Sequence, residues 1–339
     1  MVNGSMNGQQ RETSMTKIYI AAWQGPWSWR NTFYKWACPS SNLELTNDIN
    51  DADIVFQADT TDWQITAKLP PAVIVIANVL DFGDWLQEGP YLSPEIVEYV
   101  TAMKARRLAG SNVIFTAISS RVQDQLRENF SIRAKVFYYP SQVTKKISSA
   151  MLAQTAYKKK KQFVSFSRLS DPGKGIAQAV AGFKDSGLVS QGWRYLLMGP
   201  ETPPNAKDLP AGVIHAGYMP EPEMMYQLIR QSAYVLMPSY GEGLGLPIIE
   251  GLLVGTPFVT RNISPMKDVF KRSWCDRLAF DFDEDISAAL TYATTIFETK
   301  GYDNITTRGF TCAHPWTREI AFNALATFIE RVAQETCKI

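Results

Sequence analysis

Two glutamates, Glu242 and Glu250, stand at either end of a glycine-rich loop that is suited to receiving an anion. The apolar run at residues 233–237 predicts a buried strand before this loop, and a helix is expected after it. Backbone N–H groups at a helix start attract anions, and glycines such as Gly243 and Gly245 let a ligand approach the backbone closely. Since carboxylates do not bind phosphate, the glutamates suit hydroxyl groups on either side of it. Ribose, diphosphate and hexose follow one another in this way in a nucleotide sugar.

Two basic residues, Arg168 and Lys174, lie at a second expected junction between a strand and a helix. A nucleoside diphosphate gains negative charge as its bond to the sugar breaks. Fixed cations beside it therefore stabilise the transition state more than the ground state. Arginine can contact phosphate oxygens with two parallel hydrogen bonds, whereas lysine acts as a point charge. By themselves the two residues are better explained as exposed cations at a strand end, but together with the glycine-rich loop they indicate a diphosphate site.

The elements that must position these residues form two series of alternating strands and helices. Apolar runs predict strands in the first half at residues 17–23, 53–56, 72–77, 113–117 and 136–139, with helices at 94–108 and 119–130. In the second half they predict strands at residues 163–167, 194–198, 213–215, 233–237 and 258–260. This alternation predicts an α/β protein with one doubly wound parallel sheet in each half. The chain of 339 residues is long enough for two separate cores.

The second half resembles the family-4 glycosyltransferases, which have the GT-B fold. Glu242 and Glu250 have the spacing of that family's E-x7-E motif. Residues 165–175 are similar to its Gly-Arg-x4-Lys-Gly segment, with Ser167 in place of the usual glycine. Three further segments are similar to other parts of the family pattern, at residues 196–200, 213–239 and 314–316. The last of them precedes a helix expected at residues 319–333. The resemblance is extensive from about Phe163 onwards.

The polar, lysine-rich stretch at 145–162 predicts the domain boundary, and the resemblance implies what each part does. We expect residues 1–16 to be a disordered leader without a secretory signal. Residues 17–157 are then an acceptor-binding Rossmann-like domain and 158–314 a nucleotide-sugar-binding Rossmann-like domain. Residues 315–339 are expected to form a helix that crosses back to the N-terminal domain, with a central cleft between the two domains.

The resemblance also implies an activity and roles for single residues. A hexose would pass, with retention at the anomeric carbon, from a UDP- or GDP-linked sugar to a hydroxyl of a glycan or glycolipid, without a metal ion or other cofactor. The implied catalytic residues are Arg168 and Lys174 at the diphosphate and Glu242 beside the transferred sugar. Glu250 would bind the ribose hydroxyls, and the helix dipole would keep it ionised. The other implied donor-binding residues are Gly243, Leu244, Gly245, Leu246, Tyr218 and Met219.

The first half departs from the family pattern. The family has a glycine-rich turn after the first strand and a histidine that contacts the donor sugar. Here the turn at residues 24–30 has one glycine, and the two histidines are His215 and His314. A dense aromatic group follows the first strand, and it can either pack in the core or stack against an acceptor ring. Its members are Trp23, Trp27, Trp29, Phe33, Tyr34 and Trp36.

Composition narrows the choice of partners. The net charge is +1 without a basic stripe, which disfavours a nucleic-acid partner without excluding it. No apolar run in the sequence is long enough to span a membrane, so we expect at most peripheral membrane contact, through the lysine run at 158–161. This run is otherwise expected to be a solvated linker. The four scattered cysteines are expected to be reduced, in a cytoplasmic protein. The oligomeric state has no sequence signal.

Alternatives to a glycan or glycolipid glycosyltransferase remain open. One is a glycosyltransferase that acts on modified DNA bases, and another is a sugar-nucleotide-binding protein without turnover. A dinucleotide oxidoreductase would need a G-x-G-x-x-G motif after the first strand, which residues 23–27 do not provide. The Asp281-Phe-Asp283 sequence has the form of a metal-binding D-x-D, but it precedes an expected helix at 286–292 and fits N-capping acids. We therefore expect no metal site.

Overall fold

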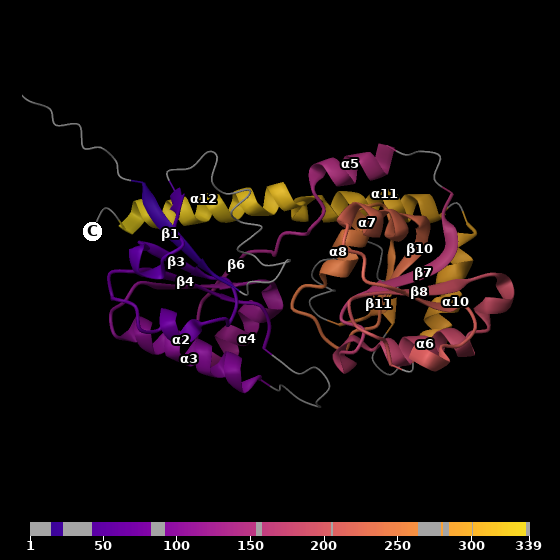
Figure 1. Cartoon of the computed structure of the whole chain (residues 1–339), viewed down its shortest axis with the longest axis horizontal. Coiled ribbons are helices and arrows are strands. Elements are labelled where there is room, and N and C mark those ends of the chain that lie inside the picture. Colours follow the sequence, from indigo (N-terminus) through magenta and orange to yellow (C-terminus); the bar gives the residue numbers. More distant parts are fainter. Residues whose placement is uncertain are drawn as a thin grey trace, which may run out of the picture.

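The structure is a computed structural model that describes residues 15–22, 43–82, 92–153, 158–204, 206–263, 279–280, 285–299 and 301–336. These residues form two lobes, each built around a parallel sheet with helices on both faces (Figure 1). The two doubly wound sheets predicted from the alternating pattern are thus confirmed. None of the described helices is long and apolar enough to cross a bilayer.

The N-terminal lobe contains a sheet whose neighbouring strands all run parallel. Across the sheet the strands are β2 (Leu43–Leu45), β1 (Thr16–Ala21), β3 (Ile54–Gln57), β4 (Ile74–Val79), β5 (Val113–Ala117) and β6 (Lys135–Val136). Every residue of β3 and β4 is buried, as expected for strands that are covered on both faces. One face carries α2 (Trp63–Thr66), α3 (Pro94–Leu108) and α4 (Ser120–Phe130) (Figure 1).

The C-terminal lobe repeats this plan with a second parallel sheet. Its strands, in order, are β12 (Ala279–Phe280), β11 (Phe258–Arg261), β10 (Ser232–Met237), β7 (Lys160–Phe166), β8 (Arg194–Met198) and β9 (Val213–Gly217). Helices α6 (Ile176–Asp185) and α10 (Ile286–Phe297) pack on one face. The opposite face carries α5 (Lys145–Ala153), α7 (Pro222–Gln231), α8 (Leu246–Leu253) and α11 (Gly301–Ala313).

The long helix α12 (Arg318–Thr336) ties the two lobes together, because it leaves the C-terminal lobe and lies along the N-terminal sheet (Figure 1). Its buried side chains, among them Phe322, Leu325 and Ile329, pack against Ile20 and Ile76 of that sheet. The crossing expected of residues 315–339 is seen in the described part of this segment.

The lysine run at 158–161 differs from the expectation of a solvated linker. Lys160 and Lys161 begin strand β7. The ammonium group of Lys159 is buried and donates to the carbonyl oxygens of Ser232 (3.1 Å) and Gly255 (2.8 Å) and to the hydroxyl of Thr256 (2.8 Å). Burial lowers the pKa of Lys159. Lys159 therefore belongs to the edge of the core of the second sheet, because buried carbonyl groups there need a donor. The other three lysines of the run are exposed.

Three of the expectations from the sequence fall on residues outside the described ranges. They concern the leader at residues 1–14, the aromatic group between residues 23 and 36, and the Asp281-Phe-Asp283 sequence. The cap of α10 is Asp285, whose carboxylate accepts from the N–H of Ser287 at 2.8 Å.

Candidate active site

The predicted cations and the glycine-rich loop meet where the strand order of the second sheet reverses. Strands β7 and β10 are neighbours in its centre, and the helices that follow them, α6 and α8, lie on opposite faces. Beyond the carboxyl ends of two such strands the chain separates, which leaves room for a ligand. Arg168 and Lys174 follow β7, and residues 239–245 follow β10.

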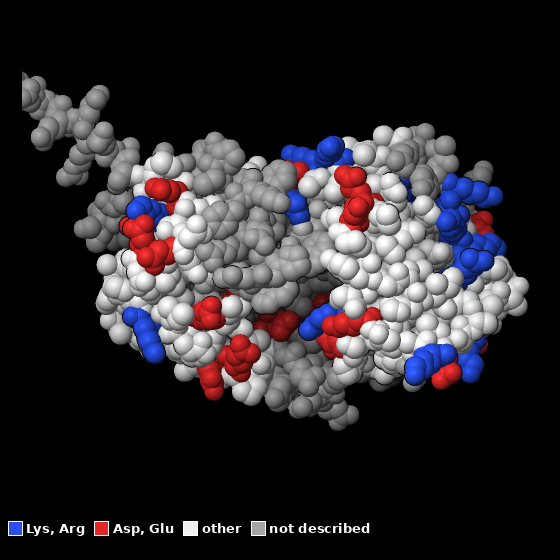
Figure 2. Space-filling view, viewed as in Figure 1, with Lys and Arg blue, Asp and Glu red and all other residues white. Residues whose placement is uncertain are grey.

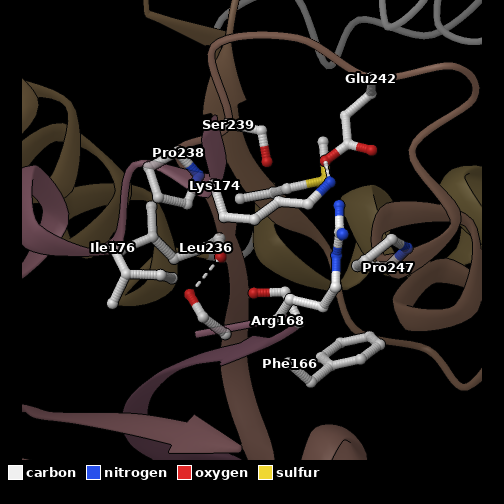
Figure 3. Close-up of a pocket in the computed structure, with 12 residues that line it drawn as sticks. Phe166, Arg168, Lys174, Ile176, Leu236, Pro238, Ser239, Glu242 and Pro247 are labelled. Atoms are coloured by element: carbon white, nitrogen blue, oxygen red, sulfur yellow. Dashed lines mark hydrogen bonds and ion pairs between the residues drawn. The ribbon is translucent and has the colours of Figure 1, made fainter. Parts of the chain in front are cut away.

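A cavity of about 150 Å³ lies at this point, and we call it the cationic cavity. Arg168, Lys174, Ser239 and Glu242 line it, and Figure 3 shows the two basic side chains and Glu242 directed towards one another. The Lys174 ammonium group donates to Glu242 Oε1 at 2.7 Å, with the two side chains only 18% and 12% exposed. The three residues predicted to be catalytic are thus brought together.

Backbone contacts between the two loops hold this arrangement. The N–H of Tyr240 donates to the carbonyl oxygen of Gly173 at 3.0 Å, which links the two loops directly. Asp171 accepts from the N–H of Gly173 at 2.8 Å and pairs with the Arg168 guanidinium at 2.7 Å. Gly175 has a φ of +65°, and a Cβ there would lie 2.4 Å from the Pro238 carbonyl oxygen. Only glycine fits this position between the loops.

A larger cavity of about 470 Å³ adjoins the first, and we call it the large cavity. The two cavities share Phe166, Ser167 and Arg168 as lining residues. The rest of the large cavity is mostly apolar and aromatic, with a few polar groups. It includes the predicted donor-binding residues Tyr218, Met219, Leu246 and Glu250, together with Tyr139, Gln142, Met198, Met225 and Tyr226.

The two glutamates of the sequence motif consequently serve different parts of the site. Glu242 lines the cationic cavity, whereas Glu250 lies on α8 and lines the large cavity. Glu250 is 6% exposed and accepts a hydrogen bond of 2.9 Å from the backbone N–H of Gln142. Gln142 lies 108 residues away in the segment that joins the two lobes, so this contact links the candidate site to the interlobe connection.

The environment of Glu250 changes its expected ionisation. Burial raises the pKa of its carboxyl from 4.5 to about 7. The N–H of Gln142, the hydroxyl of Tyr226 and the guanidinium of Arg318 oppose this rise in pKa, but they do not cancel it. We expected the helix dipole to keep Glu250 ionised, but desolvation of the buried carboxyl has a larger effect on its pKa than the groups that favour the ionised form. At neutral pH both forms are populated.

This raised pKa predicts a pH-dependent stability. Between about pH 4.5 and pH 7 the folded chain holds a proton that the unfolded chain releases, so the contribution of Glu250 to the free energy of unfolding falls as pH rises through that window. A Glu250→Gln variant lacks this titration. Its stability relative to the wild type should increase by up to about 3 kcal/mol between pH 4.5 and pH 7.5. Urea unfolding of both proteins at pH 4.5 and pH 7.5 measures the two free energies of unfolding. If the variant and the wild type differ by the same amount at both pH values, the pKa of Glu250 is not raised in the folded chain.

The remaining predicted residues occupy the loop between the two cavities. Gly245 has a φ of +80° and caps the start of α8, and the Leu244 side chain is buried in the core. Gly243 packs against the other lobe, since a Cβ at this position would lie 2.3 Å from the carbonyl oxygen of Leu80. These three residues are not lining residues of either cavity. Their predicted contacts to a ligand would be made through the backbone.

A third cavity of about 180 Å³ lies in the N-terminal lobe beside this contact. Asp59, Asn78 and Asp81 line it, together with Leu80, whose carbonyl oxygen faces Gly243. These side chains lie at or just beyond the carboxyl ends of the parallel strands β3 and β4. Sequence reasoning did not select them, although polar residues at the ends of neighbouring parallel strands are a usable signal. Figure 2 shows charged side chains of both signs around the hollow between the two lobes.

Other residues of the site have no recognisable sequence signal. Gln142 and Arg318 approach Glu250 from the two interlobe connections, and the Arg318 guanidinium donates to the side-chain oxygen of Gln142. Within the described ranges, no group of three or more His, Cys, Asp and Glu side chains is placed to hold a metal ion.

Residues 160–292 match the family model described as glycosyl transferases group 1. No curated protein sequence matches the chain. Similar solved structures include the pneumococcal O-GlcNAc transferase GtfA in complex with UDP and GlcNAc, with a TM-score of 0.64 and 13% identity over 83% of this chain and 57% of that one.

For two further solved structures, the match takes in a larger share of the other chain. The Anabaena protein HepE in complex with UDP-glucose has a TM-score of 0.65 at 14% identity, over 93% of this chain and 99% of that one. Sucrose-phosphate synthase from Thermosynechococcus elongatus has a TM-score of 0.63 at 14% identity, over 84% and 74%. The chain spans little more than half of GtfA, and at these identities the likeness establishes the fold alone. The fold class predicted from the sequence is confirmed.

Proposed function

We propose that this chain, which has the GT-B fold of glycosyltransferases and a group 1 glycosyltransferase domain at residues 160–292, transfers a hexose from a nucleoside diphosphate sugar to a hydroxyl group. The anomeric configuration would be retained, and no metal ion would take part. The acceptor hydroxyl would belong to a glycan or a glycolipid.

The observation that carries this proposal is the pair of adjoining cavities with a common wall at Phe166–Arg168. The smaller one presents two cations and a carboxylate, as a diphosphate with an attached sugar requires. The larger one presents apolar and aromatic side chains with a buried carboxylate, as a nucleoside requires. The GtfA structure is a complex with UDP and GlcNAc and the HepE structure is a complex with UDP-glucose, which favours a UDP-linked donor.

Charge stabilisation by Arg168 and Lys174 is the main catalytic effect in this proposal. The bond between the anomeric carbon and the phosphate oxygen breaks, and the diphosphate gains negative charge in a cavity where Lys174 is largely shielded from solvent. A new bond forms between the anomeric carbon and the acceptor oxygen on the same face of the sugar. The acceptor proton passes to the departing phosphate oxygen. The two cations supply the charge that a metal ion would otherwise bring.

The acceptor would reach this site from the N-terminal lobe. The cavity lined by Asp59, Asn78 and Asp81 lies beside the contact between Leu80 and Gly243, next to the donor loop. Carboxylate and amide oxygens accept hydrogen bonds from hydroxyl groups, so this lining suits a polyhydroxyl acceptor. Glu242, on the other side of the contact, would accept from a hydroxyl of the transferred sugar.

Thermal-shift measurements with UDP, GDP and ADP and their glucose, N-acetylglucosamine and mannose conjugates test the proposal. One base and one sugar should raise the melting temperature in a concentration-dependent way. The stabilising donor should then be hydrolysed slowly without acceptor, which separates a transferase from a protein that only binds sugar nucleotides. If no nucleotide binds at millimolar concentration, the proposal is wrong.

The close approach of the two lobes at Gly243 leads to a separate expectation. A Gly243→Ala substitution puts a methyl group in the space next to the Leu80 carbonyl oxygen, so the lobes must move apart. Misplacement of donor and acceptor relative to each other should lower kcat/KM by about ten-fold or more. The melting temperature should change little, since the contact lies between the lobes. Steady-state kinetics measures kcat/KM, and a thermal melt measures the melting temperature. An unchanged kcat/KM would show that the contact between Gly243 and Leu80 does not position donor and acceptor.

A further inference from the structure

Ser167 is a buried hydroxyl without a partner at the junction of the two cavities. Its Oγ has essentially no exposed area and no hydrogen-bond partner among the described residues. An unpaired buried hydroxyl destabilises the folded state, so such groups are few in folded proteins. The residue follows the last position of β7 and precedes Arg168. It also lines both the cationic and the large cavity.

The neighbouring serine of the same strand shows how an ordinary buried hydroxyl is satisfied. Ser165, which is 2% exposed, lies within 2.7 Å of the Tyr195 hydroxyl and donates to the carbonyl oxygen of Leu236. Two residues later, the backbone N–H of Ser167 still bonds to the carbonyl oxygen of Met198 at 3.2 Å. Its backbone therefore continues the sheet pairing, while its side chain has nothing comparable to bond to within the described chain.

On the basis of the proposed function, we propose that Ser167 is a donor-binding residue whose hydroxyl donates to a diphosphate oxygen of the nucleotide sugar. A nucleoside in the large cavity and a diphosphate beside Arg168 and Lys174 would have to pass the wall that Ser167 forms. Phosphate oxygens accept hydrogen bonds and carry the charge that strengthens them. The hydroxyl is covered in the structure, so the bond forms when the serine changes its staggered rotamer.

Two single substitutions separate this role from a structural one. Ser167→Ala removes an unpaired hydroxyl, so the melting temperature should stay the same or rise, while the Kd for UDP or GDP, whichever the wild type binds, should increase about ten-fold or more. Ser232→Ala is the matched control. It removes a paired and fully buried hydroxyl of β10, which donates to the Leu228 carbonyl oxygen at 2.9 Å and lines neither cavity. Its melting temperature should therefore fall while its Kd for the same nucleotide stays at the wild-type value.

Calorimetry with the nucleoside as well as the nucleoside diphosphate locates the contact. The Ser167→Ala variant should bind uridine or guanosine nearly as well as the wild type and should lose affinity only for the diphosphate. An equal loss for both ligands would overturn the assignment to the diphosphate, and unchanged binding of both would overturn the inference altogether. In either case binding of UDP or GDP to the wild type would leave the proposed function standing. Should neither nucleotide bind the wild type, both proposals fail.

Discussion

Replacement of Lys174 by methionine should lower kcat by about 10²–10³-fold, the effect typical of removing one group that stabilises developing charge. The lysine is largely shielded from solvent and pairs with Glu242 in the cationic cavity, so water cannot replace its charge effectively. Methionine keeps most of the aliphatic stem and removes the charge. Single-turnover kinetics at saturating donor isolates the chemical step from donor binding.

A matched control for this substitution is Lys184→Met, at an exposed lysine in the last turn of α6. It should retain wild-type kinetics. A second variant, Lys174→Met with Glu242→Gln, removes the buried carboxylate that the single substitution leaves without its cation. The double variant should recover stability but not kcat. If the single variant keeps its chemical rate, Lys174 does not stabilise the leaving group.

Replacement of Glu250 by alanine should weaken binding of the donor nucleotide by about 10²-fold or more. The carboxylate lines the large cavity and is the proposed acceptor for the ribose hydroxyls, and hydrogen bonds to a charged group contribute about 1.5–3 kcal/mol each. Alanine also leaves the N–H of Gln142 without the acceptor it has in the wild type. Isothermal titration calorimetry with UDP and GDP measures the loss.

The pH dependence of binding gives this assignment a second readout. Because the pKa of Glu250 is raised to about 7, the fully ionised acceptor is present only above that pH. Donor affinity in the wild type should therefore increase between pH 6 and pH 8, and Glu250→Gln should bind weakly with a flatter profile. Glu298→Ala, at an exposed glutamate paired with Lys161, serves as the control and should bind as the wild type does. If Glu250→Ala binds the donor nucleotide as tightly as the wild type does, Glu250 is not the acceptor for the ribose hydroxyls.

The sequence by itself determined the alternation of elements in both lobes and the segments that carry the site. Strand β8 and helix α3 lie at the predicted residues, since apolar periodicity and capping depend on neighbours along the chain. For the same reason Arg168, Lys174 and the glycine-rich loop were placed at strand ends before any contact was known. The short strand β2 and the helix α5 have patterns too brief or too polar to be found in this way.

Only the tertiary structure decided how these segments act together. The adjacency of β7 and β10 brings Lys174 within 2.7 Å of Glu242, a residue that follows it by 68 positions. The contact of Gln142 with Glu250 and the orphaned hydroxyl of Ser167 depend on packing between lobes and between strands. Burial, and with it the raised pKa of Glu250, comes from everything that surrounds a side chain in space, and local sequence contains little of that information.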